Sequence, residues 1–264
     1  FIREGAAFAD YYEPAMIVVG EATEGSAPGD ALMSLYTHIA APRVRTDWKT
    51  AELVKYACNA FHAVKIAFAN EMGGLAAAYG VDGRALMKSL CLDRKLNVSD
   101  AYLAPGFAFG GSCLPKDARA LLHMAQKADR QLPLIAGAMA GNDALIDAAV
   151  RLVIARGAAS VGMWGLAFKP ETDDLRESPY VELARRLIRA GCVVNAFDPL
   201  VSDGVPSLRN AEQLALVEGL RLVTDAEDLL PCDLMLLAHL PPDTQINRWR
   251  SAGVALVNLA TDIL

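Results

Sequence analysis

The last hundred residues alternate between short apolar runs and longer helical segments, and this alternation limits the fold more than any other feature of the chain. A helical segment at about 178–190, which Gly191 ends, separates the first two apolar runs. Apolar runs that alternate with helices are typical of a parallel sheet covered on both faces. The pattern predicts a Rossmann-like, doubly wound α/β domain over residues 158–264. The strands are expected at 160–165, 192–197, 222–223, 234–238 and 254–258.

Upstream of this domain, a helical period starts near Thr46 and continues to about Tyr79. Thr46 or Asp47 can cap its start, and Gly80 follows its end. A helix of about thirty residues is long for a globular domain, and such helices commonly join two lobes or span a subunit interface. We therefore expect residues 46–157 to form a helical central domain. Its shorter helices are expected at 83–91, 116–127 and 142–156.

The long helix carries a row of large apolar side chains at Phe61, Val64, Phe68 and Met72. This is more apolar surface than one lobe is expected to cover, which predicts a homodimer built on this helix. Residues 1–45 contain a short apolar run at 16–20, a helical segment at about 30–39 and a second extended piece at 41–44. They are typical of the final part of an α/β domain.

Composition excludes several classes of function. Of the 264 residues, 53% are apolar and 21% charged, which fits a well-buried globular protein. The formal net charge of −6 gives no electrostatic reason to expect nucleic acid as a partner. We also expect no membrane span, because no apolar run approaches the roughly 18 residues that one needs. The five cysteines follow no metal-type spacing, so we expect no metal and a reducing, cytoplasmic location.

Cys113 lies in a glycine-rich stretch, residues 106–117 (GFAFGGSCLPKD), that has the parts of a nucleophile site. Gly110 and Gly111 allow the backbone to approach a substrate closely. Lys116 is a cation that favours the thiolate, and Asp117 can orient a water or move a proton. A glycine-rich loop around a buried structural thiol would show a similar short motif. The whole stretch decides between the two, because it resembles the active-site segment of the nucleotide-sugar 6-dehydrogenases.

That resemblance implies an NAD-dependent, two-step oxidation of a sugar C6 alcohol to a carboxylate through a Cys113 thioester. It also implies a substrate, since the Phe-Ala-Phe variant at 107–109 is similar to the GDP-mannose branch of the family, with UDP-glucose as the alternative. Family members begin with a dinucleotide-binding domain, yet no G-x-G-x-x-G occurs in residues 1–264. Residues 1–45 are therefore expected to be the remnant of an NAD-binding domain, and we expect the chain alone to be inactive.

Four polar side chains interrupt the apolar pattern of the long helix. Lys55, Asn59, His62 and Asn70 fall within an arc of about 80° at 100° per residue. Periodicity alone allows this arc to be an ordinary solvent face. The resemblance assigns Lys55 and Asn59 to stabilisation of the oxyanion at C6, and His62 and Asn70 to substrate contacts.

Carboxylates that act on the hydrolytic water are also implied by the resemblance. Glu4 lies in a Phe-x-Arg-Glu segment similar to one in the family, and Asp117 matches a carboxylate that assists the same water. An exposed Glu near a frayed terminus is the other reading of Glu4. The resemblance further assigns a set of substrate contacts to the cysteine stretch, namely Tyr102, Gly106, Phe107 and Phe109.

A second stretch, residues 165–179 (GLAFKPETDDLRESP), also resembles the family. It follows the first strand of the predicted sheet, and this edge of an open parallel sheet is where phosphates are usually held. An ordinary loop with surface charges is the plainer reading. The resemblance makes Lys169 a nucleotide-sugar contact, and it makes Lys116 and Arg176 contacts to NAD.

Two positions depart from the GDP-mannose branch. Ala101 and Ala104 stand where that branch has an aromatic residue and an arginine that contact the nucleotide sugar. Loss of such an arginine removes a charge-assisted contact of about 1.5–3 kcal/mol. The choice between GDP-mannose and UDP-glucose therefore stays open at this stage. A non-catalytic module that only dimerises and holds a nucleotide is the second class of function considered.

Overall fold

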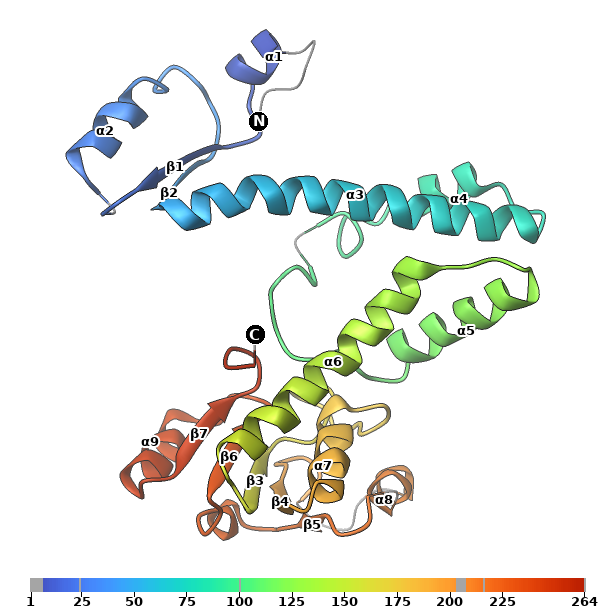
Figure 1. Cartoon of the computed structure of the whole chain (residues 1–264), viewed down its shortest axis with the longest axis vertical. Helices are drawn as coiled ribbons and strands as arrows, with labels where there is room; N and C mark the ends of the chain where they lie inside the picture. Colours follow the sequence, from blue (N-terminus) through green and yellow to red (C-terminus); the bar gives the residue numbers. More distant parts are fainter. Residues whose placement is uncertain (1–6, 24, 100, 203–207, 216, 264) are drawn as a thin grey trace. The chain divides into compact units, whose positions relative to one another are not determined.

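The structure is a computed structural model that describes residues 7–23, 25–99, 101–202, 208–215 and 217–263. It divides into two compact units, Phe1–Asn70 and Glu71–Leu264. Figure 1 shows the helices and strands that make up each unit.

The first unit contains a small two-stranded parallel sheet and most of a long helix. Its elements are α1 (Ala7–Tyr12), β1 (Ile17–Glu21), α2 (Ala27–Ser34), β2 (Arg43–Asp47) and the start of α3 (Trp48–Ala78). Strand β1 pairs with β2 from Ile17 opposite Arg43 to Glu21 opposite Asp47. The extended pieces were predicted, although α1 was not. Helix α2 starts before the predicted position because Ser26 caps it by accepting from the Gly29 N–H at 3.3 Å.

A buried carboxylate, that of Glu21, links the two strands of this small sheet. The Glu21 carboxylate is 5% exposed and accepts from both Nε and Nη2 of Arg45, and the Ser26 hydroxyl donates to it at 2.7 Å. These hydrogen bonds, led by that from Arg45, lower the pKa of Glu21 to about 2. Glu21 therefore stays ionised at neutral pH and ties β1 to β2.

Helix α3 runs over 31 residues, as the helical period predicted. Asp47 caps its start, accepting from the Thr50 N–H at 3.1 Å and from the Thr50 hydroxyl at 2.6 Å. In the second unit, the final turns of α3 are packed, and Glu71 accepts from the N–H groups of Leu134 (2.6 Å) and Ile135 (3.3 Å). That carboxylate satisfies the first turn of α6, which is a favourable place for a negative charge.

The helical part of the second unit continues with α4 (Gly83–Leu90), α5 (Leu114–Lys127) and α6 (Pro133–Ala155). Helix α6 begins nine residues before the predicted start at 142. Pro133 at its first position and the carboxylate of Glu71 start the helix there. The glycines at 137 and 141 weaken the helical pattern in the sequence, but packing outweighs that preference.

The five-stranded sheet has the order β5-β4-β3-β6-β7, and all neighbouring strands are parallel. Helices lie on both faces, which confirms the predicted doubly wound α/β fold (Figure 1). Helices α8 and α9 and the 3₁₀ helix η1 were not predicted. The elements are β3 (Ser160–Trp164), α7 (Pro179–Arg189), β4 (Val193–Phe197), α8 (Leu208–Ala215), β5 (Arg221–Leu222), η1 (Ala226–Leu229), β6 (Leu234–Leu237), α9 (Asp243–Ser251) and β7 (Ala255–Asn258).

Alternate residues of the central strands enter two different apolar clusters. Leu234 and Leu236 of β6 pack with side chains of α6 and α7, whereas Met235 and Leu237 pack with η1 and with Trp249 of α9. Because both faces are buried, the strand sequence is apolar without alternation. Helix α6 thus belongs to the core of the sheet domain at its carboxyl-terminal half.

Asp198 supports the loop that follows β3. It lies just after β4, is 3% exposed, and its Oδ2 accepts from the N–H groups of Leu166 (2.7 Å) and Ala167 (3.0 Å). Its Oδ1 accepts from Leu200 N–H at 3.0 Å. The chain at the carboxyl end of β3 is therefore fixed by a side chain from the neighbouring strand connection.

We predict that Asp198→Ala lowers the free energy of unfolding by about 3 kcal/mol, because it leaves buried N–H groups without acceptors. Urea unfolding of the chain measures this. Asp225→Ala is the matched control, since Asp225 accepts from Glu227 N–H at an exposed cap and water can replace it. Equal losses in the two variants would contradict the role given to Asp198.

Candidate functional site

Residues 106–113, called here the cysteine loop, lead into the first turn of α5. Cys113 is the residue before α5, its side chain is exposed, and its Sγ lies 3.8 Å from the Ser112 Oγ. No side-chain hydrogen bond caps the helix at Cys113. The thiol is therefore accessible to a reagent or substrate, and the backbone of the loop determines where it lies.

The cysteine loop packs directly on the β3–α7 loop, residues 165–178. A Cβ added to Gly110 would lie 2.3 Å from the Glu177 carbonyl oxygen and 2.6 Å from Cδ of Pro179. Gly111 has a φ of +86°, and a Cβ there would lie 2.7 Å from the Phe168 ring. Only glycine fits both positions. The two stretches that resemble the same family in sequence are thus in contact.

The β3–α7 loop is held by short polar contacts of its own. The Ser178 hydroxyl donates to the Leu166 carbonyl at 2.5 Å, and Phe168 N–H donates to the Asp174 carbonyl at 3.2 Å. A ring nitrogen of His239 lies 2.9 Å from the Ala167 carbonyl oxygen. Lys169 is exposed at the tip, with its Nζ 5.5 Å from the centroid of the Phe168 ring. A rigid base therefore presents Lys169 to solvent.

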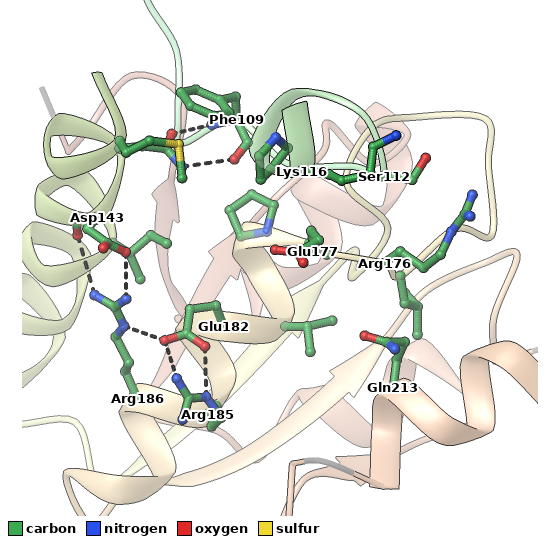
Figure 2. A pocket seen from close by; sticks show the side chains of 18 of the residues that line it. Phe109, Ser112, Lys116, Asp143, Arg176, Glu177, Glu182, Arg185, Arg186 and Gln213 are labelled. Carbon is green, nitrogen blue, oxygen red and sulfur yellow. Dashed lines mark hydrogen bonds and ion pairs between the residues drawn. The ribbon is translucent and has the colours of Figure 1, made fainter. Parts of the chain in front are cut away.

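A cleft of about 750 Å³ lies where the two loops meet α6, α7 and α8 (Figure 2). Lys116 and Arg176, the two predicted NAD contacts, both line it, together with Ser112 and Phe109. The structure thus brings together residues that are far apart in the sequence. Five basic and three acidic side chains line this cleft, although the chain as a whole is acidic.

Each cation beside the cysteine loop has an acidic neighbour. Lys116 Nζ lies 3.2 Å from Asp117, the predicted water-assisting carboxylate. Arg176 donates to Asp174 through Nη2 at 2.6 Å. The Asp174 hydrogen bond raises the pKa of Arg176, and the negative charge of a Cys113 thiolate adds to this shift. Arg176 lines the same cleft as Ser112, the residue that precedes Cys113, so its guanidinium group lies on the cysteine side of the two loops.

The floor of the cleft is an ion-pair network between α6 and α7. Arg186 donates to Asp143 at 2.8 Å and to Glu182 at 2.6 Å, and Arg185 also donates to Glu182 (Figure 2). Arg186 donates in addition to Asp147 of α6 at 2.7 Å. Burial opposes ionisation of Glu182, but the two arginines outweigh it and lower its pKa. The network fixes the distance between the helices beneath the cysteine loop.

The predicted substrate contacts of the cysteine stretch differ in exposure. Tyr102 is exposed and has a φ of 64°. Phe107 and Phe109 are half-buried, and the Phe107 ring stacks on Tyr180 with centroids 5.5 Å apart. A Cβ added to Gly106 would find no atom within 4 Å. Phe107 therefore also anchors the loop to the sheet domain.

The remaining predicted residues lie in the first unit. Lys55, Asn59, His62 and Asn70 are all on α3 and all exposed, so each is accessible to a ligand. Glu4 lies outside the residues that the structure describes.

Sequence reasoning missed three residues at this site. Asn142 of α6 bonds to the backbone of Phe109, and Arg119 of α5 forms a two-bond ion pair with Glu177 at 2.7 and 3.2 Å. These pairs join positions far apart in the sequence, so no local motif could indicate them. The unexpected φ of 52° at Glu177 marks the same contact.

Two further classes of site find no support in the part of the chain that the structure describes. No group of three or more His, Cys, Asp or Glu side chains there is placed to hold a metal ion. Among the same residues, no helix is both long and apolar enough to cross a bilayer.

We predict that Gly111→Ala destabilises the chain by about 2 kcal/mol or more, because the new methyl group meets Phe168 and the residue must keep a positive φ. Gly137→Ala is the control, since it adds the same methyl group inside α6 where nothing lies within 4 Å. That change should stabilise by about 0.5–1 kcal/mol. Chemical unfolding of both variants measures the difference, and a neutral Gly111→Ala would contradict the packing.

Each of the two stretches lies in a region of the chain that matches a known protein family. Residues 49–144 match the UDP-glucose/GDP-mannose dehydrogenase family, central domain, and residues 162–240 match the UDP binding domain of the same family. GDP-mannose 6-dehydrogenase of Pseudomonas putida is 48% identical over 198 residues, which are 75% of this chain and 45% of that protein. UDP-glucose 6-dehydrogenase YwqF of Bacillus subtilis is 34% identical over 204 residues, 76% of this chain and 46% of that protein.

A solved structure confirms the likeness in three dimensions. GDP-mannose dehydrogenase of Pseudomonas aeruginosa, crystallised as a ternary complex, superposes with a TM-score of 0.89 at 39% identity. The match covers 98% of this chain and 60% of that one, so the chain spans about half the length of the relatives it matches. Both family matches together include the cysteine loop and the β3–α7 loop. The chain therefore belongs to the UDP-glucose/GDP-mannose dehydrogenase family.

Proposed function

We propose that this chain is the substrate-oxidising part of an NAD-dependent GDP-mannose 6-dehydrogenase, which converts GDP-mannose to GDP-mannuronate. The observation that carries the proposal is the exposed Cys113 beside a cleft lined by Lys116 and Arg176. Identities of 47–49% to relatives named GDP-mannose 6-dehydrogenase, against 34–37% to those named UDP-glucose 6-dehydrogenase, support the choice of sugar nucleotide.

The proposed chemistry takes place at the sugar C6 and the Cys113 sulfur. Carbon C6 first loses a hydride while its hydroxyl loses a proton, which gives an aldehyde. The Cys113 thiolate adds to that aldehyde and forms a thiohemiacetal anion, and loss of a second hydride from C6 of this anion gives a thioester. Water then attacks the thioester carbon, the C–S bond breaks, and the products are the carboxylate and the free thiol.

Side chains of this chain are assigned to the charges that develop. Lys55 and Asn59 stabilise the oxyanion at C6, first in the alcohol oxidation and again in the thiohemiacetal. Asp117 and Glu4 orient the hydrolytic water and accept its proton. These assignments rest on the resemblance, and the exposure of Lys55 and Asn59 on α3 is compatible with them.

NAD supplies the hydride acceptor in both oxidations. Lys116 and Arg176 would hold it, and they fit the group because both line one cleft beside Cys113 and could face a diphosphate. Arg176 already bonds to Asp174, which fixes the direction of its guanidinium group.

The sugar nucleotide is assigned to Lys169, with a further set of contacts that rests on the resemblance, namely His62, Asn70, Tyr102, Gly106, Phe107 and Phe109. Lys169 is exposed at the carboxyl edge of the parallel sheet, where phosphates are commonly bound. The match to a UDP binding domain over residues 162–240 supports a nucleotide sugar as the ligand of this domain.

The division into domains, the oligomeric state and the cellular location are also proposals. We assign residues 1–45 to the end of an NAD-binding domain, 46–157 to a central dimerisation domain and 158–264 to the nucleotide-sugar domain. Exposed Phe61 and Val64 on α3 support a homodimer through that helix. All five cysteines are free thiols, which supports a reducing, cytoplasmic setting.

UDP-glucose is the alternative substrate. Ala101 and Ala104 remove two contacts typical of the GDP-mannose branch. Relatives named UDP-glucose 6-dehydrogenase share 34–37% identity with this chain. If the chain acts without further parts, a dimerising nucleotide-binding module is the second candidate function.

Thermal unfolding with each nucleotide sugar tests the proposal. A ligand at about one hundred times its dissociation constant adds about 2.7 kcal/mol of stability, which raises the melting temperature by about 5–10 °C. We expect this with GDP-mannose, and a smaller rise with UDP-glucose, because a pocket that fits guanine discriminates against uracil.

Matched variants show whether the rise comes from the assigned site. Lys169→Ala should reduce the shift with GDP-mannose, whereas Lys127→Ala, an exposed lysine at the end of α5, should leave it unchanged. A shift with UDP-glucose and none with GDP-mannose would overturn the substrate. The absence of a shift with either would count against a nucleotide-sugar site in this chain.

A further inference from the structure

Asn142 uses both ends of its carboxamide on one residue of the cysteine loop. Its Oδ1 accepts from the Phe109 N–H at 2.7 Å, and its Nδ2 donates to the Phe109 carbonyl at 3.0 Å. This pairing satisfies both backbone polar groups of a residue that lies outside helix and strand. It also fixes the plane of the peptide groups on both sides of Phe109.

The helix that carries Asn142 is itself firmly packed. Ile146 and Ala149, one and two turns further along α6, are 3% and 0% exposed and belong to the core cluster of the sheet domain. Ala108, next to Phe109, is part of the same cluster. Asn142 therefore connects the cysteine loop to a helix that is packed into the buried core of the domain.

Three anchors together determine the path of the loop toward Cys113. Phe107 stacks on Tyr180, Asn142 holds Phe109, and the two glycines close against the β3–α7 loop. Asn142 provides the polar anchor, and a hydrogen-bonded pair constrains direction as well as distance. Cys113 has no cap hydrogen bond of its own, so its place depends on these anchors.

We propose that Asn142 is the positioning residue of the cysteine loop, which sets the Cys113 sulfur beside Arg176 and the cleft. Its catalytic meaning rests on the proposed function, in which Cys113 is the nucleophile. The positional claim does not, because it concerns the loop and can be measured without substrate.

Two measurements on the 264-residue chain test the claim in Asn142→Leu, which keeps the volume and removes both hydrogen bonds. Hydrogen exchange of peptides covering 107–112 should accelerate at least fivefold, with exchange in β3 and β6 unchanged. The second measurement compares alkylation of Cys113 by iodoacetate and by iodoacetamide. In the wild type, the anionic reagent should be favoured at Cys113 relative to the exposed Cys91, because Lys116 and Arg176 line the cleft next to Ser112, the neighbour of Cys113.

In Asn142→Leu this preference for iodoacetate at Cys113 should fall at least twofold, while the ratio at Cys91 stays the same. Asn142→Ala should give the same changes in hydrogen exchange and in reagent preference as Asn142→Leu. If Asn142→Leu does not fold, the result for Asn142→Ala is the test. Asn247→Ala, an exposed asparagine on α9, is the control and should match the wild type.

Unchanged exchange at 107–112 with an unchanged reagent preference would overturn the proposal. Equal acceleration in β3 and β6 would overturn it as well, since Asn142 would then act only on general stability. Neither readout depends on dehydrogenase activity. A failure of the nucleotide-sugar assignment therefore leaves this test intact, and a failure here leaves that assignment intact.

Discussion

The close contact of Gly110 and Gly111 with the β3–α7 loop is the constraint on which the rest of the site depends. The Glu177 carbonyl, Pro179 and the Phe168 ring occupy the space that any side chain at 110 or 111 would need. The loop that carries Cys113 therefore takes its shape from the domain assigned to the nucleotide sugar. Asp198 stabilises the first turn of that same domain's β3–α7 loop from beneath. The chemistry proposed at Cys113 and the binding proposed at Lys169 thus depend on the same packed pair of loops.

Charge pairing gives the cleft its second property. Each cation near Cys113 has a carboxylate within ion-pair distance, and because all three cations are more than a third exposed these pairs are expected to add little stability. Arg119 and Glu177 add a link between α5 and the β3–α7 loop, although both are about half exposed and the pair is expected to add little stability. The pair instead orients the two side chains, since a two-bond arginine–carboxylate pair fixes the plane of both groups.

Much of the fold could be predicted from the sequence, for physical reasons. The strands of the large sheet are buried on both faces, so their apolar runs are visible in the sequence, and the order of elements then favours a doubly wound sheet. Helix α9 could not be found in this way, because only Trp249 of its residues is buried. The predicted start of α6 was wrong by nine residues, because the carboxylate of Glu71 in α3 accepts from its first turn and no local sequence pattern shows that contact.

The same contrast between local and long-range signals applies to the residues of the site. Cys113, Lys116 and Arg176 lie in contiguous stretches with family resemblance, and the structure places Lys116 and Arg176 on one cleft beside Cys113. Asn142 and Arg119 act on residues 33 and 58 positions away, respectively, so only the folded chain reveals their partners. The residues proposed to contact a ligand could be named from the sequence, whereas those that hold the loop in place could not.

Covalent labelling tests the central claim most directly, namely that a bound nucleotide sugar presents its C6 to Cys113. The reagent is a GDP-mannose analogue that carries a bromoacetylamino group at C6, and peptide mass spectrometry locates the label. The account predicts labelling of Cys113 at least tenfold faster than of the exposed Cys91, with protection by GDP-mannose. Labelling of both cysteines at similar rates, or no protection by GDP-mannose, would contradict it.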